Sequence, residues 1–369
     1  MATIENPAIP KGSTVLVTGA NGFLGSHIVD QFLRTGYRVR AAVRDPRKES
    51  WANELFGKLY GKENFELVAV PAMDVEGAFD EIVKGIDIFV HSAAVVTFEP
   101  EASKVIPVTI AGALNALKAA YSEPSVKRFV LTSSSTAAVG LLDEPGTIVT
   151  EDKYNEKAIK KAWDGPPYEP SHSIIVYEAS KAQSEQEVWK YHKEHQAKRP
   201  DLVVNTGTLA AIVPLEILST NKQYPISVLP NFIIGRSVDP VGQGSRSTFS
   251  LILDLWNGKK NEMLAALPRR LEHFVDVEDT ALLHVAAAVL PHVQGQRIFA
   301  FADEFSWDRT LSVMRKIDPT RNLPEEFSDG QGQWNVIVAS SKAEKLLQEL
   351  GRPGWTRFED SVAANVRDA

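Results

Sequence analysis

Short apolar runs alternate with amphipathic stretches through the first third of the chain. Runs bounded by polar or glycine residues predict buried strands at 15–17, 38–43, 65–70, 86–90 and 128–131. Apolar residues on one face predict helices between them, at 26–33, 49–60, 78–83 and 105–121. Strands separated by helices of this length indicate a doubly wound α/β fold with a parallel sheet. Ligands of such sheets bind at the carboxyl ends of the strands.

The first predicted strand leads into a glycine-rich turn, TGANGFLG at 18–25, and then into a helix. Gly19 permits the tight turn, Gly22 lets a pyrophosphate approach the backbone, and Gly25 lets helix and strand pack closely. Backbone N–H groups at the start of the helix, those of Phe23 and Leu24, favour a bound phosphate. Glycines also serve ordinary turns, but between a strand and a helix this spacing predicts a Rossmann-type dinucleotide site.

The residue that ends the second predicted strand distinguishes between two dinucleotides. Domains that bind NAD usually carry an acidic residue there for the ribose 2′-hydroxyl, whereas this chain has Arg44. A guanidinium suits a 2′-phosphate, and Arg40 and Lys48 could add positive charge. The alternative is that these are solvated surface cations. We predict that NADP(H) is the cofactor and that Arg44 and Lys48 bind it.

Small and hydroxyl-bearing residues follow the fourth and fifth predicted strands. In HSAA, at 91–94, Ala93 would let a cofactor ribose lie against the backbone, and we expect His91 to be a core residue. The fifth strand ends in five hydroxyl residues, TSSST at 132–136. They could be turn chemistry alone. At the mouth of a nucleotide cleft, we expect one of them to hydrogen-bond a substrate oxygen.

Tyr177 and Lys181 stand four residues apart in YEASK, which begins a predicted helix ending near residue 195. Residues at this spacing share a helical face. A tyrosine pKa near ~10 is too high for easy proton exchange at neutral pH, and a neighbouring cation lowers it. The pair could be an ordinary exposed tyrosine and lysine. Behind a nucleotide fold and a serine cluster, it predicts general acid catalysis.

Composition excludes several other classes of protein. The chain has 369 residues, 44% of them hydrophobic, enough for one large α/β domain with an added lobe. Its net charge is −7 and it has no cysteine, so we expect no nucleic-acid partner, no disulfide and no metal site. We see no signal sequence and no apolar run long enough to cross a bilayer, and therefore expect a soluble, cytoplasmic protein without a membrane partner.

The motifs TGANGFLG, TSSS and YEASK, in this order, resemble those of the extended short-chain dehydrogenase/reductase family. The chain is most similar to its carbonyl reductases of red yeast type, near the dihydroflavonol and cinnamoyl-CoA reductases. The segments SVKRFVLTSS, VLPNFIIG and LGRPGW extend the resemblance over nearly the whole chain. The resemblance implies NADPH-dependent reduction of aldehydes and ketones to alcohols.

Carried over by position, the resemblance also implies a set of site residues. Ser134 matches the catalytic serine, although Ser135 is one step away, and Tyr177 matches the general acid. Lys181 matches its partner, which lowers the tyrosine pKa and holds the nicotinamide ribose. Pro230 begins the loop beside the nicotinamide.

Two features depart from the family pattern. An Asp usually follows the third strand near the adenine, but here Ala72 takes that position and Asp74 comes two residues later. Relatives also run almost directly from a segment like LVVN (202–205) into VLPN (228–231), whereas here 206–227 stands between them. We interpret 206–227 as an insertion foreign to the ancestral domain, of the kind an unspliced intron would encode. Thr206 or Ser227 would supply one junction residue.

We therefore predict a Rossmann domain at 10–205, with 271–302 returning to it, and a smaller C-terminal substrate lobe at 228–270 and 303–369. The later part of the chain predicts helices at 247–256, within 274–290, at 307–317 and at 342–350, and a core strand at 297–302. Asp276 and Asp279 are expected to be structural. Candidate residues for the substrate cleft are Val95, Phe98, Pro230 and Phe232.

The sequence leaves two alternatives to a carbonyl reductase. A nucleotide-sugar epimerase or dehydratase uses the same fold, but dehydratases of that type carry acidic residues where this chain has Ser135 and Thr136. A catalytically impaired cofactor-binding protein is the second alternative, which the insertion favours and the intact Ser134, Tyr177 and Lys181 oppose. We expect a monomer or homodimer that acts on a small-molecule carbonyl.

Overall fold

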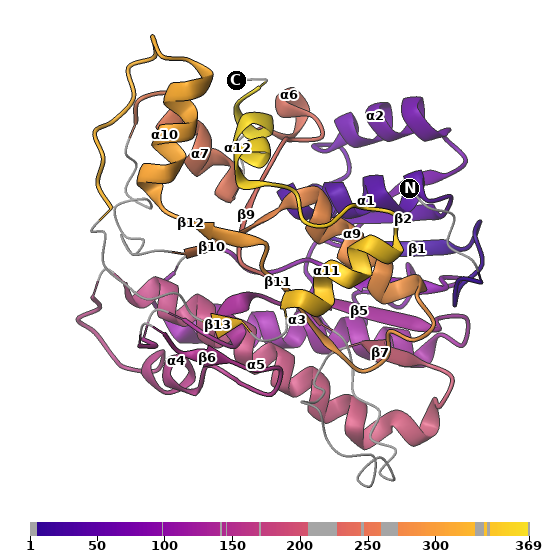
Figure 1. Ribbon diagram of the computed structural model, residues 1–369. Helices are drawn as coiled ribbons and strands as arrows, with labels where there is room; N and C mark the ends of the chain where they lie inside the picture. Colours follow the sequence, from indigo (N-terminus) through magenta and orange to yellow (C-terminus); the bar gives the residue numbers. More distant parts are fainter. Residues whose placement is uncertain are drawn as a thin grey trace, which may run out of the picture.

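A parallel sheet runs through the larger part of the molecule (Figure 1). The computed structural model describes residues 6–97, 99–140, 142–144, 146–169, 171–205, 227–244, 247–259, 272–328, 336–337 and 340–367. The strand order is β11-β8-β5-β4-β1-β2-β3, and β7 also pairs with β5. The strands are β1 (Thr14–Thr18), β2 (Arg38–Val43), β3 (Phe65–Ala69), β4 (Ile88–His91), β5 (Arg128–Thr132), β7 (Val203–Asn205), β8 (Ser227–Pro230) and β11 (Arg297–Ala300). The prediction of a doubly wound Rossmann-type sheet is confirmed.

Helices cover both faces of this sheet, which explains why its central strands are continuous apolar runs. One core cluster joins the sheet to α1 (Phe23–Arg34), α2 (Ser50–Tyr60), α9 (Val277–Val289) and α11 (Ser340–Glu349). A second core lies on the opposite face, beneath α3 (Ala102–Ser122) and α5 (His172–His195), which pack against each other (Figure 1).

The strands β7 and β8 occupy successive parts of one strand position. Val203 and Val204 pair with Arg128 and Phe129 of β5, and Asn205 pairs with Val130. Ser227 then pairs with Leu131, the next residue of β5. Asn205 and Ser227 are therefore neighbours along the same ladder. The segment 206–226, most of the predicted insertion, lies outside the described residues.

A smaller lobe stands beside the carboxyl ends of the large sheet (Figure 1). Its three-stranded sheet has the order β12-β10-β9 and an aromatic-rich core. The strands are β9 (Phe232–Ile234), β10 (Glu272–Asp276) and β12 (Asp303–Phe305), and the helices are α6 (Pro240–Gln243), α7 (Thr248–Trp256), α10 (Trp307–Ile317) and α12 (Phe358–Val366). The remaining elements are η1 (Ser135–Ala137), β6 (Ile148–Val149), α4 (Glu156–Lys161), η2 (Gln196–Lys198) and β13 (Val336–Ile337).

The domain limits differ from the predicted ones at three places. The strand β8 belongs to the large sheet, because it pairs with β5 and β11, although 228–270 was assigned to the lobe. The strand β10 lies in the small sheet, although 271–302 was assigned to the Rossmann domain. The helix α11 packs on α9 and β11 rather than in the lobe. The chain therefore crosses between the two units more often than the sequence predicted.

Two helix predictions were also wrong. The segment 78–83 forms turns, flanked by Gly77 and Gly85 with φ of +78° and +70°. Its apolar pattern reflects the burial of Phe79 and Val83 without a regular helix. The helix containing Tyr177 begins five residues earlier, at His172, since tertiary packing of the Ile-Ile-Val run overrides its weak helix propensity.

The helix α3 is, contrary to expectation, long and apolar enough to cross a membrane. Of its most apolar window, 56% is buried inside the fold, against α5 and the sheet. Core helices of soluble proteins meet the same criteria, so α3 alone does not indicate a membrane span.

Candidate active site

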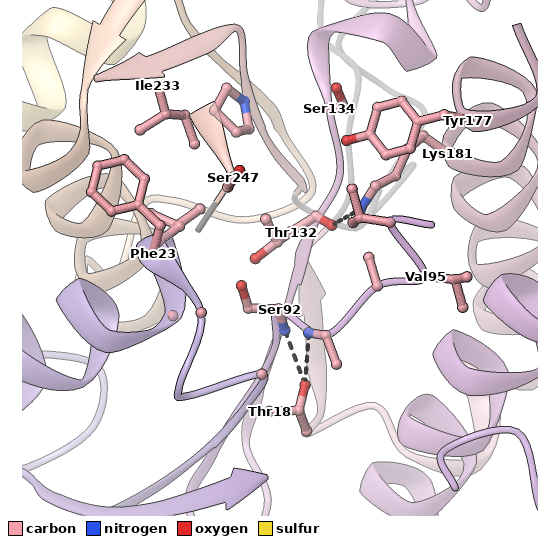
Figure 2. Close-up of a pocket in the computed structure, with 18 of the residues that line it drawn as sticks. Thr18, Phe23, Ser92, Val95, Thr132, Ser134, Tyr177, Lys181, Ile233 and Ser247 are labelled. Atoms are coloured by element: carbon pink, nitrogen blue, oxygen red, sulfur yellow. Dashed lines mark hydrogen bonds between the residues drawn. The ribbon is translucent and has the colours of Figure 1, made fainter. Parts of the chain in front are cut away.

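A cavity of about 1110 Å³ opens along the carboxyl ends of β1, β2, β4 and β5, facing the lobe. Figure 2 shows Phe23 on one side of it and Ser134, Tyr177 and Lys181 on the other. Every predicted cofactor or catalytic residue lines it: Gly19, Gly22, Phe23, Leu24, Gly25, Arg44, Lys48, Ala93, Ser134, Tyr177, Lys181 and Pro230. Residues distant in the sequence are thus brought to one place.

Gly19 and Gly25 of the glycine turn have no room for a side chain. Gly19 has a φ of +67°, and a Cβ there would lie 3.0 Å from the backbone of Ala93. A Cβ on Gly25 would lie only 2.0 Å from the Gly19 carbonyl oxygen. Gly22 is the N-cap of α1 and provides no side-chain cap, so the first N–H groups of the helix remain available to an anion.

Thr18 ties the end of β4 to the end of β1. Its Oγ1 accepts hydrogen bonds from the backbone N–H groups of Ser92 and Ala93, each at 3.1 Å (Figure 2). The same hydroxyl lies 3.0 Å from Nδ1 of His91, and burial lowers the pKa of His91 to about 3, which keeps the ring neutral. His91 is buried beneath the cavity, which confirms the prediction of a core residue.

Two exposed cations stand where β2 ends. The side chains of Arg44 and Lys48 line the cavity, and neither forms a hydrogen bond or ion pair in the described part of the chain. Arg40 lies elsewhere: its guanidinium donates to Glu66 and, at 2.7 Å, to the carbonyl of Ile82. The added positive charge expected from Arg40 is therefore absent from the cavity.

Ser134 and Tyr177 form the hydroxyl pair of the site. The Ser134 hydroxyl neighbours the Tyr177 phenol, as Figure 2 shows, and accepts from Thr136 Oγ1 at 3.0 Å. Burial raises the pKa of Tyr177, and the Ser134 hydroxyl opposes the rise. We predicted that Lys181 would lower this pKa; burial dominates instead and keeps the phenol protonated. Ser135 lines the same cavity, so position alone does not distinguish it from Ser134.

Lys181 is a buried cation beside Tyr177. Its Nζ lies 6.0 Å from the centroid of the tyrosine ring and donates to the carbonyl of Thr132 at 3.4 Å. Burial lowers the pKa of Lys181 to about 8, and the charge of Glu185 opposes that change. Thr132 is held in turn by His284, whose Nε2 lies 2.8 Å from its Oγ1.

The lobe contributes an aromatic wall to the cavity. Phe232 lies 5.2 Å from Phe305 and 5.4 Å from Trp307 between ring centroids, and all three line the cavity. Val95 lies on another side, as Figure 2 shows. The remaining cleft candidate, Phe98, lies outside the described residues.

The two residues that the sequence analysis compared for contact with the adenine follow β3. Ala72 and Asp74 both line the cavity after β3. Both the family position, taken by Ala72, and the later carboxylate of Asp74 therefore lie in the wall of the cavity.

Sequence reasoning missed the contacts that connect distant segments to the site. Gln243 of the lobe donates to the Gly22 carbonyl and to Ser26 Oγ, each at 2.9 Å, and so fixes the glycine turn. Glu49 accepts from Asn21 Nδ2 at 2.7 Å on the other side of that turn. No local pattern signals such contacts, since their partners lie 28 to 221 residues apart.

This cavity, on a sheet of this strand order, defines a Rossmann-type dinucleotide enzyme with a serine, a tyrosine and a lysine at its centre. The model of the NAD dependent epimerase/dehydratase family matches residues 15–210. The chain belongs to that family, the extended short-chain dehydrogenases/reductases.

Similar proteins match the chain over nearly its whole length. Aldehyde reductase 2 of Sporidiobolus salmonicolor is 37% identical and aligns over 98% of this chain and 97% of its own length. The ketoreductase adrE of Penicillium rubens is 34% identical over 99% of both chains. The fold resembles that of Gre2 from Candida albicans, solved in complex with NADPH, with a TM-score of 0.76, 22% identity, and 96% and 98% of the two chains covered.

Proposed function

We propose that this chain is an NADP-dependent oxidoreductase that reduces aldehydes and ketones to alcohols, with Tyr177 as the proton donor. The main support is that the hydroxyl groups of Ser134 and Tyr177 line the same cavity as the glycine turn and Arg44. The full-length similarity to proteins named aldehyde reductase and ketoreductase supports the same chemistry.

The residues of the cavity fit NADPH. The glycine turn leaves backbone exposed for the pyrophosphate, and Arg44 and Lys48 provide free positive charge for the 2′-phosphate. Ala93, fixed through Thr18, and Pro230 line the same cavity and would hold the nicotinamide ribose and ring. The bound cofactor supplies the hydride that is added to the carbonyl carbon.

The protein's own groups act on the carbonyl oxygen. Tyr177, which burial keeps protonated, donates a hydrogen bond to that oxygen and then gives it the proton. Ser134 donates a second hydrogen bond and stabilises the negative charge that develops there. The Lys181 cation stabilises the phenolate that remains, and it would also hold the nicotinamide ribose.

The wall of Phe232, Phe305 and Trp307 favours a substrate whose carbonyl carries an apolar or aromatic group. We infer a cytoplasmic enzyme, monomeric or homodimeric, with a small-molecule carbonyl as its partner.

The test is NADPH oxidation by the purified chain with a panel of aryl ketones, β-ketoesters and aldehydes, followed by identification of the alcohol. Turnover with at least one class and a preference for NADPH over NADH is the expected result. No turnover with any class, together with tightly retained NAD(H) and conversion of a sugar nucleotide, would favour an epimerase or dehydratase. Cofactor binding without either reaction would favour the catalytically impaired binding protein.

A further inference from the structure

A buried carboxylate lies one helical turn beyond Lys181. Tyr177, Lys181 and Glu185 follow one another at intervals of four on α5 and so share a face. Glu185 is fully buried, and each of its oxygens accepts two hydrogen bonds. Ser133 Oγ donates to one oxygen at 2.9 Å, and Ser227 Oγ donates to the other at 2.6 Å.

The other two hydrogen bonds come from Arg297 on β11. Its Nε and Nη2 donate to the two oxygens of Glu185 at 2.8 and 3.1 Å, a bidentate pair with both side chains inaccessible to solvent. Its Nη1 donates to the carbonyls of Glu151 and Lys153 at 2.9 and 2.6 Å, and its guanidinium lies 4.4 Å from the ring centroid of Tyr154. Glu185 thus joins α5 to β11, β8 and the end of β5.

Charged and titratable groups surround Lys181 on several elements. On α5 itself these are Tyr177 and Glu185, and on β4 the neighbour is His91, whose pKa of about 3 leaves it neutral. Of these groups, Glu185 is the one whose charge favours the ammonium form of Lys181. Arg297 binds this carboxylate, and both of their side chains are inaccessible to solvent.

We propose that Glu185 is a positioning residue of the reductase site: held by Arg297, Ser133 and Ser227, its carboxylate keeps Lys181 cationic and anchors the face of α5 that carries Tyr177. The same carboxylate accepts a hydrogen bond from Ser133, which directly precedes Ser134 in the chain. The inference rests on the proposed function, because it assigns Lys181 a role that requires the charge.

The test compares pH profiles of kcat for wild type, Glu185→Gln and Glu185→Asp. The alkaline limb of the profile is the fall of kcat at high pH, which we assign to loss of the Lys181 proton. Glutamine keeps the shape of Glu185 and loses its charge, so this limb should move about one pH unit lower. Aspartate keeps the charge, so its limb should stay at the wild-type pH even if its Tm is reduced. The affinity for NADPH is measured over the same pH range and should show the same shift in Glu185→Gln, which makes the result independent of turnover.

Glu185→Gln leaves Arg297 without its anion. The double variant Glu185→Gln/Arg297→Gln therefore removes the charge of Glu185 while leaving a neutral pair. Its alkaline limb should also lie at a lower pH than that of wild type. Ser227→Ala serves as the matched control, since it removes one hydrogen bond to Glu185 but no charge; it should lower Tm without moving the limb. The inference is overturned if Glu185→Gln or the double variant folds but its alkaline limb stays at the wild-type pH. It is also overturned if neither of these two variants folds. Absence of carbonyl reduction in wild type overturns the proposed function instead, while the NADPH profiles still decide on Glu185.

Discussion

Removing 206–226 should leave an intact and more stable protein. Asn205 pairs with Val130 and Ser227 with Leu131, so the residues on either side of this segment hold consecutive positions in one parallel ladder. Joining Asn205 to Ser227 by a peptide bond gives a continuous strand from β7 into β8, with no change in the register of either part. Ser227 fills the junction position in the structure, so the first deletion keeps Ser227 of the two residues, Thr206 and Ser227, that the sequence left open.

The size of the effect follows from chain entropy. Closing a loop of n residues costs about (3/2)RT ln n, which for this segment is roughly 2.7 kcal/mol at 25 °C. Unfolding entropy is about 2.1 cal/mol/K per residue, or about 0.75 kcal/mol/K for a chain of this size. The deletion should therefore raise Tm by roughly 3–4 °C. Turnover with NADPH should be equal to or above that of the full chain.

A control deletion that differs by one residue sharpens the test. Deleting 206–227 instead would move Val228 into the position of Ser227 and shift the strand by one residue. Val228 packs in the core under α9, whereas Leu229 packs on the opposite face beside Phe299, so the shift exchanges the two faces. We expect this variant to lose cooperative unfolding. Deleting 207–227 keeps the register with Thr206 in place of Ser227 and should behave almost like the first deletion.

Thermal melts and NADPH oxidation of the deletion variants and the full chain decide the matter. If the deletion of 206–226 unfolds the protein or abolishes turnover, 206–226 is a necessary part of the native structure and the idea of a foreign insertion is wrong. Equal behaviour of the deletions of 206–226 and 206–227 would show that the ladder register does not control folding here.

Three further predictions concern single side chains. Tyr177→Phe should leave the NADPH Kd within a few-fold but reduce kcat by roughly 10²–10⁴-fold, because only the phenol proton is lost. A kcat near that of wild type would remove Tyr177 from the mechanism. A larger loss of kcat in Ser135→Ala than in Ser134→Ala would assign the catalytic serine to Ser135. Arg44→Asp should raise KM for NADPH far more than for NADH, since a partner of the 2′-phosphate becomes a like charge; equal changes would contradict that contact. Burial and the charge of Asp279 raise the pKa of Asp276 to about 7, so the folded state binds this proton more tightly than the unfolded state, and Asp276 lowers the free energy of unfolding as pH rises from about 4 through 7. In urea unfolding at pH 5 and pH 8, Asp276→Asn should therefore be more stable relative to wild type at pH 8 than at pH 5. The same stability difference between variant and wild type at both pH values would refute this.

The sequence predicted most reliably those elements whose signals are local. The strand Arg38–Val43 and the helix Trp307–Ile317 were predicted with the bounds that the structure has. In the helix, Ser306 Oγ accepts from the N–H of Arg309, the N-cap pattern that also marks a helix start in sequence. Most residues of the cavity were predictable for a similar reason, because they stand at strand ends or at the start of α1, which the topology brings to one edge of the sheet. Tyr177 and Lys181 lie inside α5 and were predicted from their spacing of four residues.

Predictions that depended on long-range packing were less successful. Apolar residues at 78–83 are buried as expected, but the glycines on either side lead to turns, and no periodicity distinguishes these from a short helix. The net direction of the Tyr177 pKa was also out of reach. The spacing of Tyr177 and Lys181 shows that a cation is near the phenol, but it does not show how completely the fold removes both groups from water.

Ser227 connects the two main inferences. It is the first residue after 206–226, it pairs with Leu131 of β5, and its hydroxyl donates to the carboxylate of Glu185. An error of one residue in this strand would therefore replace the serine by Val228, remove one of the four hydrogen bonds to Glu185 and leave an apolar side chain against a buried charge. The junction after 205 must thus be accurate for the active site as well as for the sheet. If the deletion of 206–226 raises Tm but moves the alkaline limb of kcat, the strand is continuous but the hydrogen bonds around Glu185 have changed. Measuring Tm and the pH profile on the same variant therefore separates the effect on the sheet from the effect on Glu185.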